Sequence, residues 1–358
     1  MPDTASLKFC ELPLEDTSPS ATVLDVPTQI KSRPISIKPH DIDCTPPPFA
    51  PPASETTVIS QSACMATAPT TQSASPYQTK HPYDIIAPKA NLNEWLVEAP
   101  PISDWARKLY REYVGITDDE ELKQHLMEIR ADAWAIYQYR CVASFMFVNY
   151  NLSDTYGREW YHSNILERLR NEGALFLDLA CAFGHTARNL VFDGVNDAQI
   201  VSADLRREFW ELGYKLFRDR DKFHGKFFQG DILDEEYLKE WEGKFDILHV
   251  SALFHLFNVE DQKKIMRRII NLLSKKPGSV FFGRAAGNTI PQYKINPIRS
   301  QGLYQHNEES FKEMFAETVR GEEWDVKVIL RTDFHGRPDS VDEIGGKRGG
   351  LRFMITRL

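Results

Sequence analysis

Several features that mark special classes of protein are scarce in this chain of 358 residues. No apolar run approaches the ~18 residues of a membrane span, and the most apolar stretch, CVASFMFV at 141–148, suits a core helix. The five cysteines, at 10, 44, 64, 141 and 181, have neither metal-ligand nor disulfide spacing, which is typical of a reducing compartment. Net charge is −8 and no basic stripe occurs, so neither a metal nor a nucleic acid is expected.

Residues 1–82 contain none of the 19 glycines but 14 of the 21 prolines. Proline, serine, threonine and alanine fill runs such as CTPPPFAPPASETT, and no apolar period of 2 or 3.6 persists. Such a segment cannot bury enough apolar surface to offset its ordering entropy, so we predict a disordered tail. It has neither the basic start nor the apolar run of a secretory signal. The sequence thus predicts a cytoplasmic protein, not bound to membranes, that acts on a small molecule.

Residues 90–172 are predicted to form a helical cap. Apolar residues in ISDWARKLYREYV and GITDDEELKQHLMEIRADAWAIYQYR recur close to the helical period. Thr117 stands three residues before Glu120, which is the spacing of a capping box. This block is rich in tryptophan and tyrosine, which we expect mainly to pack an interior. As a set they could line a pocket for a large apolar substrate, and the block is also a candidate surface for a homodimer.

In residues 173–358, short apolar runs alternate with helical segments. This alternation predicts a parallel sheet covered on both faces. The final pair of strands has no obvious helix between its members. That combination is typical of the seven-stranded, Rossmann-like α/β sheet of class I methyltransferases, whose last strand is antiparallel to the fifth. The expected strands are ALFLDLA, QIVSADL, GKFFQGDI, FDILHVSAL, GSVFFGRAAG, WDVKVILRTDF and GLRFMITRL.

Acidic residues stand at three consecutive strand ends. Asp178, Asp204 and Asp231 are 26 and 27 residues apart, and ligands of parallel sheets bind at the carboxyl ends of the strands. Asp204 suits the two hydroxyls of a ribose. Asp231 suits an adenine amino group, with Ile232 packing on the ring. Asp178 would repel a pyrophosphate but would attract the ammonium and sulfonium of S-adenosylmethionine, which is therefore the expected cofactor.

The loop after the first expected strand, LACAFGHT, carries one glycine where a nucleotide-binding loop usually has several. Glycine is required where φ is positive or a ligand presses on the chain. Alanine is tolerable at Ala180 and Ala182 if both keep negative φ, whereas Gly184, at the entry to the next helix, is expected to tolerate no side chain. With acids at the next two strand ends, the loop is predicted to bind the cofactor.

Five segments carry a resemblance to fungal secondary-metabolite methyltransferases of meroterpenoid pathways, over roughly residues 90–358. They are LDLACAFGHTARNLVFDG, ADLRREFWELGYKLFRDRDKF, SALFHLFNVEDQ, PGSVFFGRAAG and YQHNEESF. The resemblance implies a class I S-adenosylmethionine-dependent O-methyltransferase that esterifies the carboxyl of a polyketide–terpenoid intermediate. It implies cofactor contacts at Asp178, Ala180, Gly184, Asp204, Leu205, Asp231 and Ile232. Family members more often have glycine where Ala180 stands.

The acceptor decides whether the site needs a base. A carboxylate is already anionic at neutral pH, whereas a phenol, with a pKa of ~10, benefits from one. We take His255 as the first candidate base, although a histidine on a helix face can also be satisfied by the backbone. Groups that could seat an acid are His255, Arg284, Arg299, Tyr304 and His306. The segment HNEESF also has the pattern of a helix start capped by Asn307. Arg284 could instead form an ion pair on the surface.

Two functions of other classes fit the same sequence. A pericyclase or isomerase would bind the cofactor without spending its methyl group. A non-catalytic regulator of secondary metabolism would use the predicted tail for interaction. Formation of S-adenosylhomocysteine from the cofactor distinguishes the methyltransferase from both.

Overall fold

A computed structural model of the chain describes residues 95–295, 302–319, 321–332, 342 and 344–358. The predicted tail at 1–82 lies outside these residues, as does Arg299. Six α-helices of the described part precede the first strand, and two of them continue into a turn of π-helix. They are α1 (Asp104–Leu109), α2 (Asp119–Ile136), α3 (Arg140–Ala143), α4 (Leu152–Tyr156), α5 (Arg158–Tyr161) and α6 (Glu167–Asn171).

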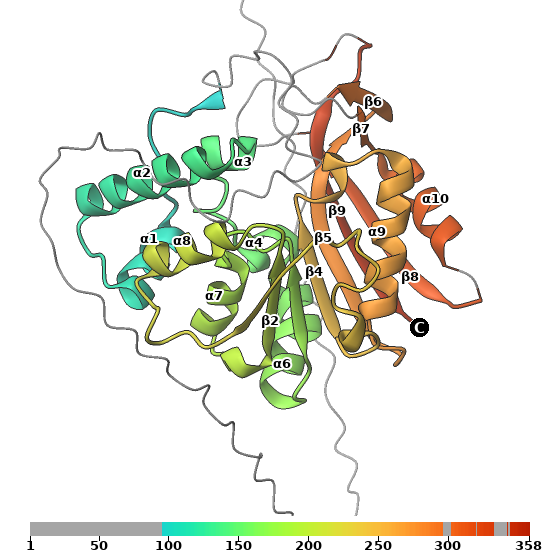
Figure 1. Cartoon of the computed structure of the whole chain (residues 1–358), viewed down its shortest axis with the longest axis horizontal. Coiled ribbons are helices and arrows are strands. Elements are labelled where there is room, and N and C mark those ends of the chain that lie inside the picture. The colour runs from blue at the N-terminus through green and yellow to red at the C-terminus, as the bar shows by residue number, and fades with distance from the viewer. Residues whose placement is uncertain (1–94, 296–301, 320, 333–341, 343) are drawn as a thin grey trace, which may run out of the picture. The chain divides into compact units, whose positions relative to one another are not determined.

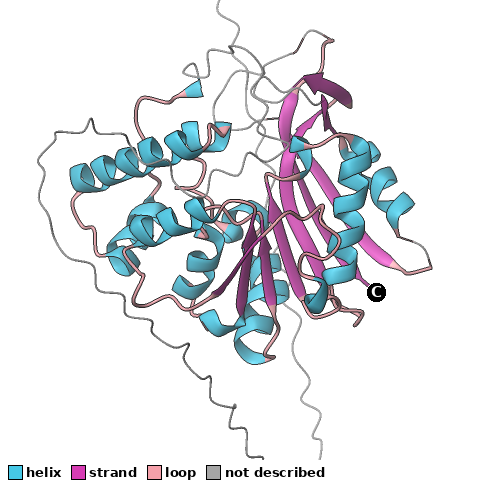
Figure 2. Cartoon of the chain, viewed as in Figure 1, coloured by secondary structure: helices cyan, strands magenta, loops and turns pink. Residues whose placement is uncertain are grey.

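Seven strands form one sheet in the order β3-β2-β1-β4-β5-β9-β8, and Figure 2 shows them as a single twisted layer. The first five are parallel neighbours, and β9 is antiparallel to both β5 and β8. This confirms the class I methyltransferase sheet and the antiparallel last strand. The strands are β1 (Phe176–Leu179), β2 (Ile200–Asp204), β3 (Lys226–Gln229), β4 (Ile247–Ser251), β5 (Val280–Asn288), β8 (Trp324–Arg331) and β9 (Arg348–Arg357).

Four further α-helices connect the strands in the described part. They are α7 (His185–Phe192), α8 (Arg207–Phe217), α9 (Val259–Leu272) and α10 (Glu308–Thr318). A short hairpin of β6 (Gln292–Ile295) and β7 (Gly302–Gln305), which the sequence analysis did not predict, follows β5. Figure 1 shows α9 and α10 on the side of the sheet that carries β8 and β9, and α7 and α8 beside β2.

The two faces of the sheet bury alternate residues of each strand, as the period of a pleated strand requires. On one face, Leu177 and Leu248 pack with apolar side chains of α9 and α10. On the other, Phe176, Ile247 and Phe282 pack with α4 to α7. A third cluster joins α1 and α2 to α8. Helices α4 to α6 therefore share a core with the sheet, whereas α1 and α2 pack on α8.

Two predicted helix starts have different outcomes. Asn307 caps α10, where its side chain and that of Ser310 form a reciprocal capping box, as expected. The predicted cap Thr117 is wrong by one residue, because Asp118 Oδ1 accepts from the backbone of Glu121, 2.8 Å away, and begins α2. Aspartate is at least as good an N-cap as threonine, so the local sequence offered two neighbouring starts.

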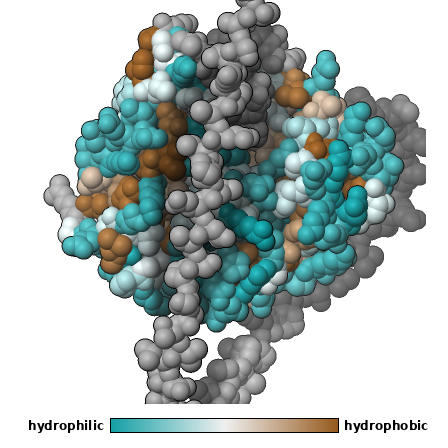
Figure 3. All heavy atoms as spheres, turned by 180° about the vertical axis from the view of Figure 1, so that it is seen from behind, coloured by the Kyte–Doolittle hydropathy of each residue, from teal (hydrophilic) through white to brown (hydrophobic). Residues whose placement is uncertain are grey.

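The surface of the described residues is mainly hydrophilic in the view of Figure 3, with separate apolar areas. Exposed large apolar side chains include Ile290, Tyr293 and Ile295, at or next to β6. No helix in the described ranges combines the length and apolar composition that a bilayer crossing would need.

Candidate active site

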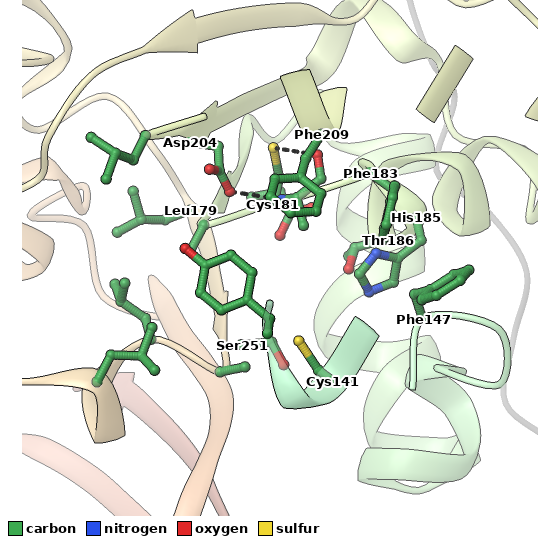
Figure 4. Close-up of a pocket in the computed structure, with 18 of the residues that line it drawn as sticks. Cys141, Phe147, Leu179, Cys181, Phe183, His185, Thr186, Asp204, Phe209 and Ser251 are labelled. Carbon is green, nitrogen blue, oxygen red and sulfur yellow. Dashed lines mark hydrogen bonds between the residues drawn. The ribbon is translucent and has the colours of Figure 1, made fainter. Parts of the chain in front are cut away.

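One pocket opens at the carboxyl ends of β1, β2 and β4, where the sequence analysis placed the ligand. Figure 4 shows Asp204 on one side of this cavity, Ser251 and Cys141 on another, and His185 and Thr186 on a third. The lining combines apolar walls with a few polar groups, as ligand pockets usually do. Its polar and charged side chains include Asp178, Asp204, Asp231, His185, His249, Ser251 and Arg284.

The loop after β1 takes a left-handed backbone at three alternate positions. Ala180, Ala182 and Gly184 have φ of 58°, 47° and 64°. The expectation that both alanines keep negative φ is therefore wrong, since the tight turn requires the glycine conformation even where a methyl is present. Each alanine bears a cost of roughly 1 kcal/mol. Such strain gathers at functional sites, and Ala252, with φ 59°, lines the same pocket.

Gly184 has no room for a side chain, as the sequence analysis expected. A Cβ built there would lie 2.4 Å from the Trp210 ring and 2.5 Å from the Arg188 guanidinium. Gly213 of α8 is similarly crowded, because its Cβ would lie 2.1 Å from the Phe183 carbonyl oxygen. Both glycines let α8 pack directly on the loop.

Asp204 is the last residue of β2, and its carboxylate holds the loop that follows the neighbouring strand β1. Its Oδ2 accepts from the backbone of Ala182 at 2.8 Å, and its Oδ1 accepts from that of Arg206 at 2.9 Å. Burial raises the pKa of Asp204 to about 6, against the lowering effect of these two hydrogen bonds. Each carboxylate oxygen has a further lone pair, so the side chain can also accept from a ligand.

The remaining predicted cofactor residues also line the pocket. Asp231 follows β3, and its Oδ1 accepts from the backbone of Leu233 at 2.9 Å. Ile232 is buried, and Leu205 is half-buried next to Asp204. The structure thus brings all seven predicted positions, with the exception of Gly184, into the pocket lining. Gly184 instead supports the loop from behind.

Asp178 lies near the end of β1, where the sequence placed it, and is 1% exposed. It pairs across the sheet with His249 of β4, and its Oδ1 is 2.7 Å from His249 Nδ1. Its Oδ2 is also buried and has no hydrogen-bond partner within the described residues. Buried polar atoms are nearly always satisfied, so this oxygen suits a donor that arrives with a ligand.

His249 links Asp178 to the helical block. Its Nε2 is 2.8 Å from the hydroxyl of Tyr150, which in turn is 3.1 Å from that of Tyr156. Burial by itself lowers the pKa of His249, but interactions with Tyr150 and Asp178 outweigh burial and raise it to about 9. This residue was not among the predicted site residues. Its signal was a single histidine within the otherwise apolar ILHV of a buried strand.

Arg284 of β5 brings positive charge to the same end of the pocket. Its guanidinium lies over the ring of Tyr150, 3.9 Å from the centroid, and its Nε donates to Ser251 Oγ at 3.0 Å. Within the described part of the chain, no carboxylate forms an ion pair with Arg284. The alternative of a surface ion pair is thus not what the structure shows.

His185 begins α7 and lines the pocket. Burial lowers the pKa of His185 to about 3, and the nearby charge of Arg284 acts in the same direction, so the ring is neutral. Its buried Nδ1 has no hydrogen-bond partner among the residues described. This histidine was not among the predicted site residues, although it directly follows Gly184.

The other predicted acceptor-binding residues lie elsewhere. His255 is not among the lining residues, and its Nδ1 accepts from the backbone of Ala286 at 3.2 Å. His306 is buried, and its Nδ1 is 2.9 Å from the hydroxyl of Ser310. Tyr304 packs against Tyr293 in the β6–β7 hairpin. The structure therefore places Arg284, but not His255, among the residues that line the pocket.

S-adenosylmethionine matches the donor set at β1, β2 and β3. Its ammonium would meet the unpartnered oxygen of Asp178, and its ribose hydroxyls would meet Asp204. The acids line this side of the pocket, and they would oppose a phosphate-bearing ligand. The residues present therefore fit a cationic adenosyl cofactor.

Comparison with known proteins gives two family matches. Residues 95–148 match the meroterpenoid methyltransferase N-terminal domain, and residues 176–276 match a methyltransferase domain. The chain is 35% identical to "O-methyltransferase atr3" of Stereocaulon alpinum, over 66% of this chain and 68% of that protein. It is 33% identical to "Methyltransferase ausD" of Aspergillus calidoustus, over 63% and 79%.

Among solved structures, phosphoethanolamine N-methyltransferase 2 of Haemonchus contortus in complex with S-adenosyl-L-methionine matches 70% of this chain and 59% of its own. The sequence identity is 14% and the TM-score is 0.41.

Proposed function

Because the chain belongs to the fungal meroterpenoid-type methyltransferases, we propose that it methylates the carboxyl group of a polyketide–terpenoid intermediate. It is an S-adenosylmethionine-dependent methyltransferase that acts on small secondary metabolites. The carboxyl acceptor rests on one observation. Arg284 faces the pocket and has no carboxylate partner among the described residues.

The donor would occupy the acidic side of the pocket. Asp204 would accept from the ribose hydroxyls, Asp231 from the adenine amino group, and Ile232 would pack on the adenine ring. Asp178 would face the ammonium. When bound, S-adenosylmethionine supplies a methyl group on a sulfonium, which an anionic oxygen can attack directly. What the protein adds is alignment and exclusion of water.

The acceptor would occupy the side formed by β4 and β5. Two nitrogens of the Arg284 guanidinium are free to donate to a carboxylate, while its Nε is held by Ser251. A charge-assisted pair of this kind fixes the orientation of an acid. No base is needed for an acceptor that is already ionised at neutral pH. Walls formed by Phe147, Leu253 and Phe257 would receive the apolar part of the acceptor.

A phenolic hydroxyl is the second candidate acceptor, and His185 is the observation that favours it. This histidine is neutral, and its Nδ1 lacks a partner within the described residues. Its Nδ1 could therefore accept a hydrogen bond from a phenolic hydroxyl and orient it, whereas a ring with a pKa of about 3 is a weak base. Both candidates use the same donor site, so they differ only in the atom that is methylated.

An experiment on a bifunctional probe separates them. The enzyme is incubated with S-adenosylmethionine carrying a deuterated methyl group and a panel of hydroxylated benzoic acids with apolar side chains. A methyl ester is cleaved by mild alkali, whereas an aryl methyl ether survives. We expect a labelled product that alkali cleaves, with one equivalent of S-adenosylhomocysteine.

Phenols of the same skeleton without the carboxyl group serve as controls and should remain unmethylated. A labelled product that survives alkali, or equal turnover of acid and phenol, contradicts the carboxyl assignment. Cofactor binding without S-adenosylhomocysteine formation on any acid or phenol of the panel would contradict methyl transfer to this class of acceptor.

A further inference from the structure

Four side chains form a hydrogen-bonded chain beneath the pocket. It runs from Asp178 through His249 and Tyr150 to Tyr156, with separations of 2.7, 2.8 and 3.1 Å. All four are buried, at 1, 1, 2 and 8% exposure. The chain joins β1 and β4 to the helical block, and a purely packing role would not require so many polar atoms in a core.

Both ring nitrogens of His249 form hydrogen bonds within the protein, so neither is available to bind a ligand, although the residue lines the pocket. When the imidazole is charged, it donates to Asp178 and to Tyr150, whose hydroxyl can then donate to Tyr156. When it is neutral, Nε2 accepts from Tyr150 instead. Because every hydrogen bond of the chain survives either state, the position of the Tyr150 ring does not depend on the proton.

Tyr150 is anchored at its backbone as well. Asn189 Nδ2 of α7 donates to the Tyr150 carbonyl oxygen at 2.6 Å. The ring, held at both ends, presents its face to the Arg284 guanidinium 3.9 Å away. A cation over an aromatic face gains about 0.5–2 kcal/mol, according to its exposure. The direction in which Arg284 points therefore depends on the ring and on Ser251.

We infer that His249 and Tyr150 are positioning residues that hold Arg284 in place for the acceptor. Neither touches the acceptor, and both act through the guanidinium. Asp178 belongs to the same series of hydrogen bonds but also faces the donor side of the pocket. His249 therefore connects the donor side of the pocket with the acceptor side. The consequence for the acceptor rests on the proposed role of Arg284 as its carboxylate anchor.

The test compares two tyrosine-to-phenylalanine variants. Y150F removes the hydroxyl that pins the ring and keeps the ring itself. Y161F is the control, because Tyr161 of α5 is also buried and its hydroxyl donates to Asp193 at 2.7 Å, whereas the Tyr150 hydroxyl bonds to both His249 and Tyr156. Thermal unfolding shows whether the two variants lose similar stability.

The first measurement needs no acceptor. Solvent exchange of the Arg284 Nε proton, followed by nitrogen-15 NMR with S-adenosylhomocysteine bound, should become at least fivefold faster in Y150F. In Y161F the change should stay within twofold. If both variants exchange alike, the positioning role of Tyr150 is refuted. H249N should also accelerate this exchange, because His249 is the hydrogen-bond partner that holds the Tyr150 hydroxyl.

The second measurement uses benzoate as the probe anion and benzamide as its neutral counterpart. We expect Y150F to weaken benzoate binding at least fivefold, with the affinity for S-adenosylhomocysteine within twofold of the wild type. Equal loss of both ligands would mean general damage and would overturn the inference. If the wild type itself fails to prefer benzoate, the proposed carboxylate anchor fails, and the exchange measurement decides the positioning role alone.

Discussion

The two sides of the pocket differ in the sign of their charge. The side formed by β1, β2 and β3 carries Asp178, Asp204 and Asp231, whereas the side formed by β4 and β5 carries His249 and Arg284. Opposite charges within one cavity suit two ligands of opposite charge. A cationic methyl donor and an anionic acceptor would each be drawn to its own side. The same arrangement would disfavour either ligand in the other's place.

The largest effect is expected from D204A. The variant would lose the acceptor for the ribose hydroxyls and leave the backbone N–H groups of Ala182 and Arg206 without their partner. We expect the Kd for S-adenosylhomocysteine, measured by calorimetry, to rise about 100-fold, or ~2.7 kcal/mol. E235A removes an exposed acid nearby and should change the Kd less than twofold. Similar losses in both variants would contradict the assignment of donor binding to the acidic side.

The converse effect is expected from R284M, which keeps most of the side-chain volume and removes the charge. The KM for a carboxylic acceptor should rise about 30-fold, because a charge-assisted hydrogen bond of roughly 2 kcal/mol is lost. Affinity for the donor should stay within twofold. R267M, on the exposed face of α9, is the control. If R284M weakened the donor as much as the acceptor, the division of the pocket by charge would be wrong.

The pH dependence of donor affinity should also distinguish the acidic side of the pocket from the cationic side. Burial raises the pKa of Asp204 to about 6, so donor affinity should fall about tenfold between pH 7 and pH 5 as the carboxylate takes up a proton. Over the same interval Asp204 contributes more to folding stability, because the folded state binds that proton more tightly than the unfolded chain. D204N should show neither dependence between pH 5 and pH 7. A wild-type donor affinity that is flat in this range would refute the titration.

On the cationic side the pKa of His249 is raised to about 9. Asp178, Tyr150, Arg284 and His185 are the titratable or charged groups around it. The acceptor affinity should be constant between pH 7 and pH 8 and should decline as pH rises through 9, because the pocket loses a positive charge. In H249N this decline should disappear, and its persistence would assign the titration to another group.

The smallest effects concern the strained loop on the acidic side. A180G and A182G should each stabilise the protein by about 0.5 kcal/mol, because relief of the left-handed alanine outweighs the extra entropy of an unfolded glycine. A187G, inside α7, should destabilise it by about 1 kcal/mol. Urea unfolding measures all three. If the loop variants behaved like A187G, positive φ at the alanines would carry no cost.

Local patterns in the sequence predicted the elements well. Period-2 and period-3.6 apolar runs located the seven strands of the main sheet, and the helix-free closing pair correctly indicated an antiparallel last strand. Asn307 was recognised as a cap because capping involves only neighbouring residues. The β6–β7 hairpin was missed, since each of its strands has four residues, too few for a periodic pattern to be recognised.

The site was predicted only in part, and its errors are all non-local. Asp204 and Asp231 were found because a strand end is visible in the sequence. The strand end at Asp178 was also recognised, but its partner His249 was not, because nothing near Asp178 in the sequence indicates a contact 71 residues away. His255 was chosen for its place after a strand, but the pocket contains His185 and His249 instead. Whether a histidine reaches a cavity depends on residues distant in the chain.

By itself, the amino-acid sequence determined the order of strands and helices and the acids at the strand ends, because these follow from side-chain periodicity and turn chemistry within a few residues. Only the tertiary structure decided the backbone of Ala180 and Ala182 and the partnership of Asp178, His249 and Tyr150. Those features arise where α8 presses on a loop and a helical block meets the sheet. They depend on distances between segments, which no short stretch of sequence encodes.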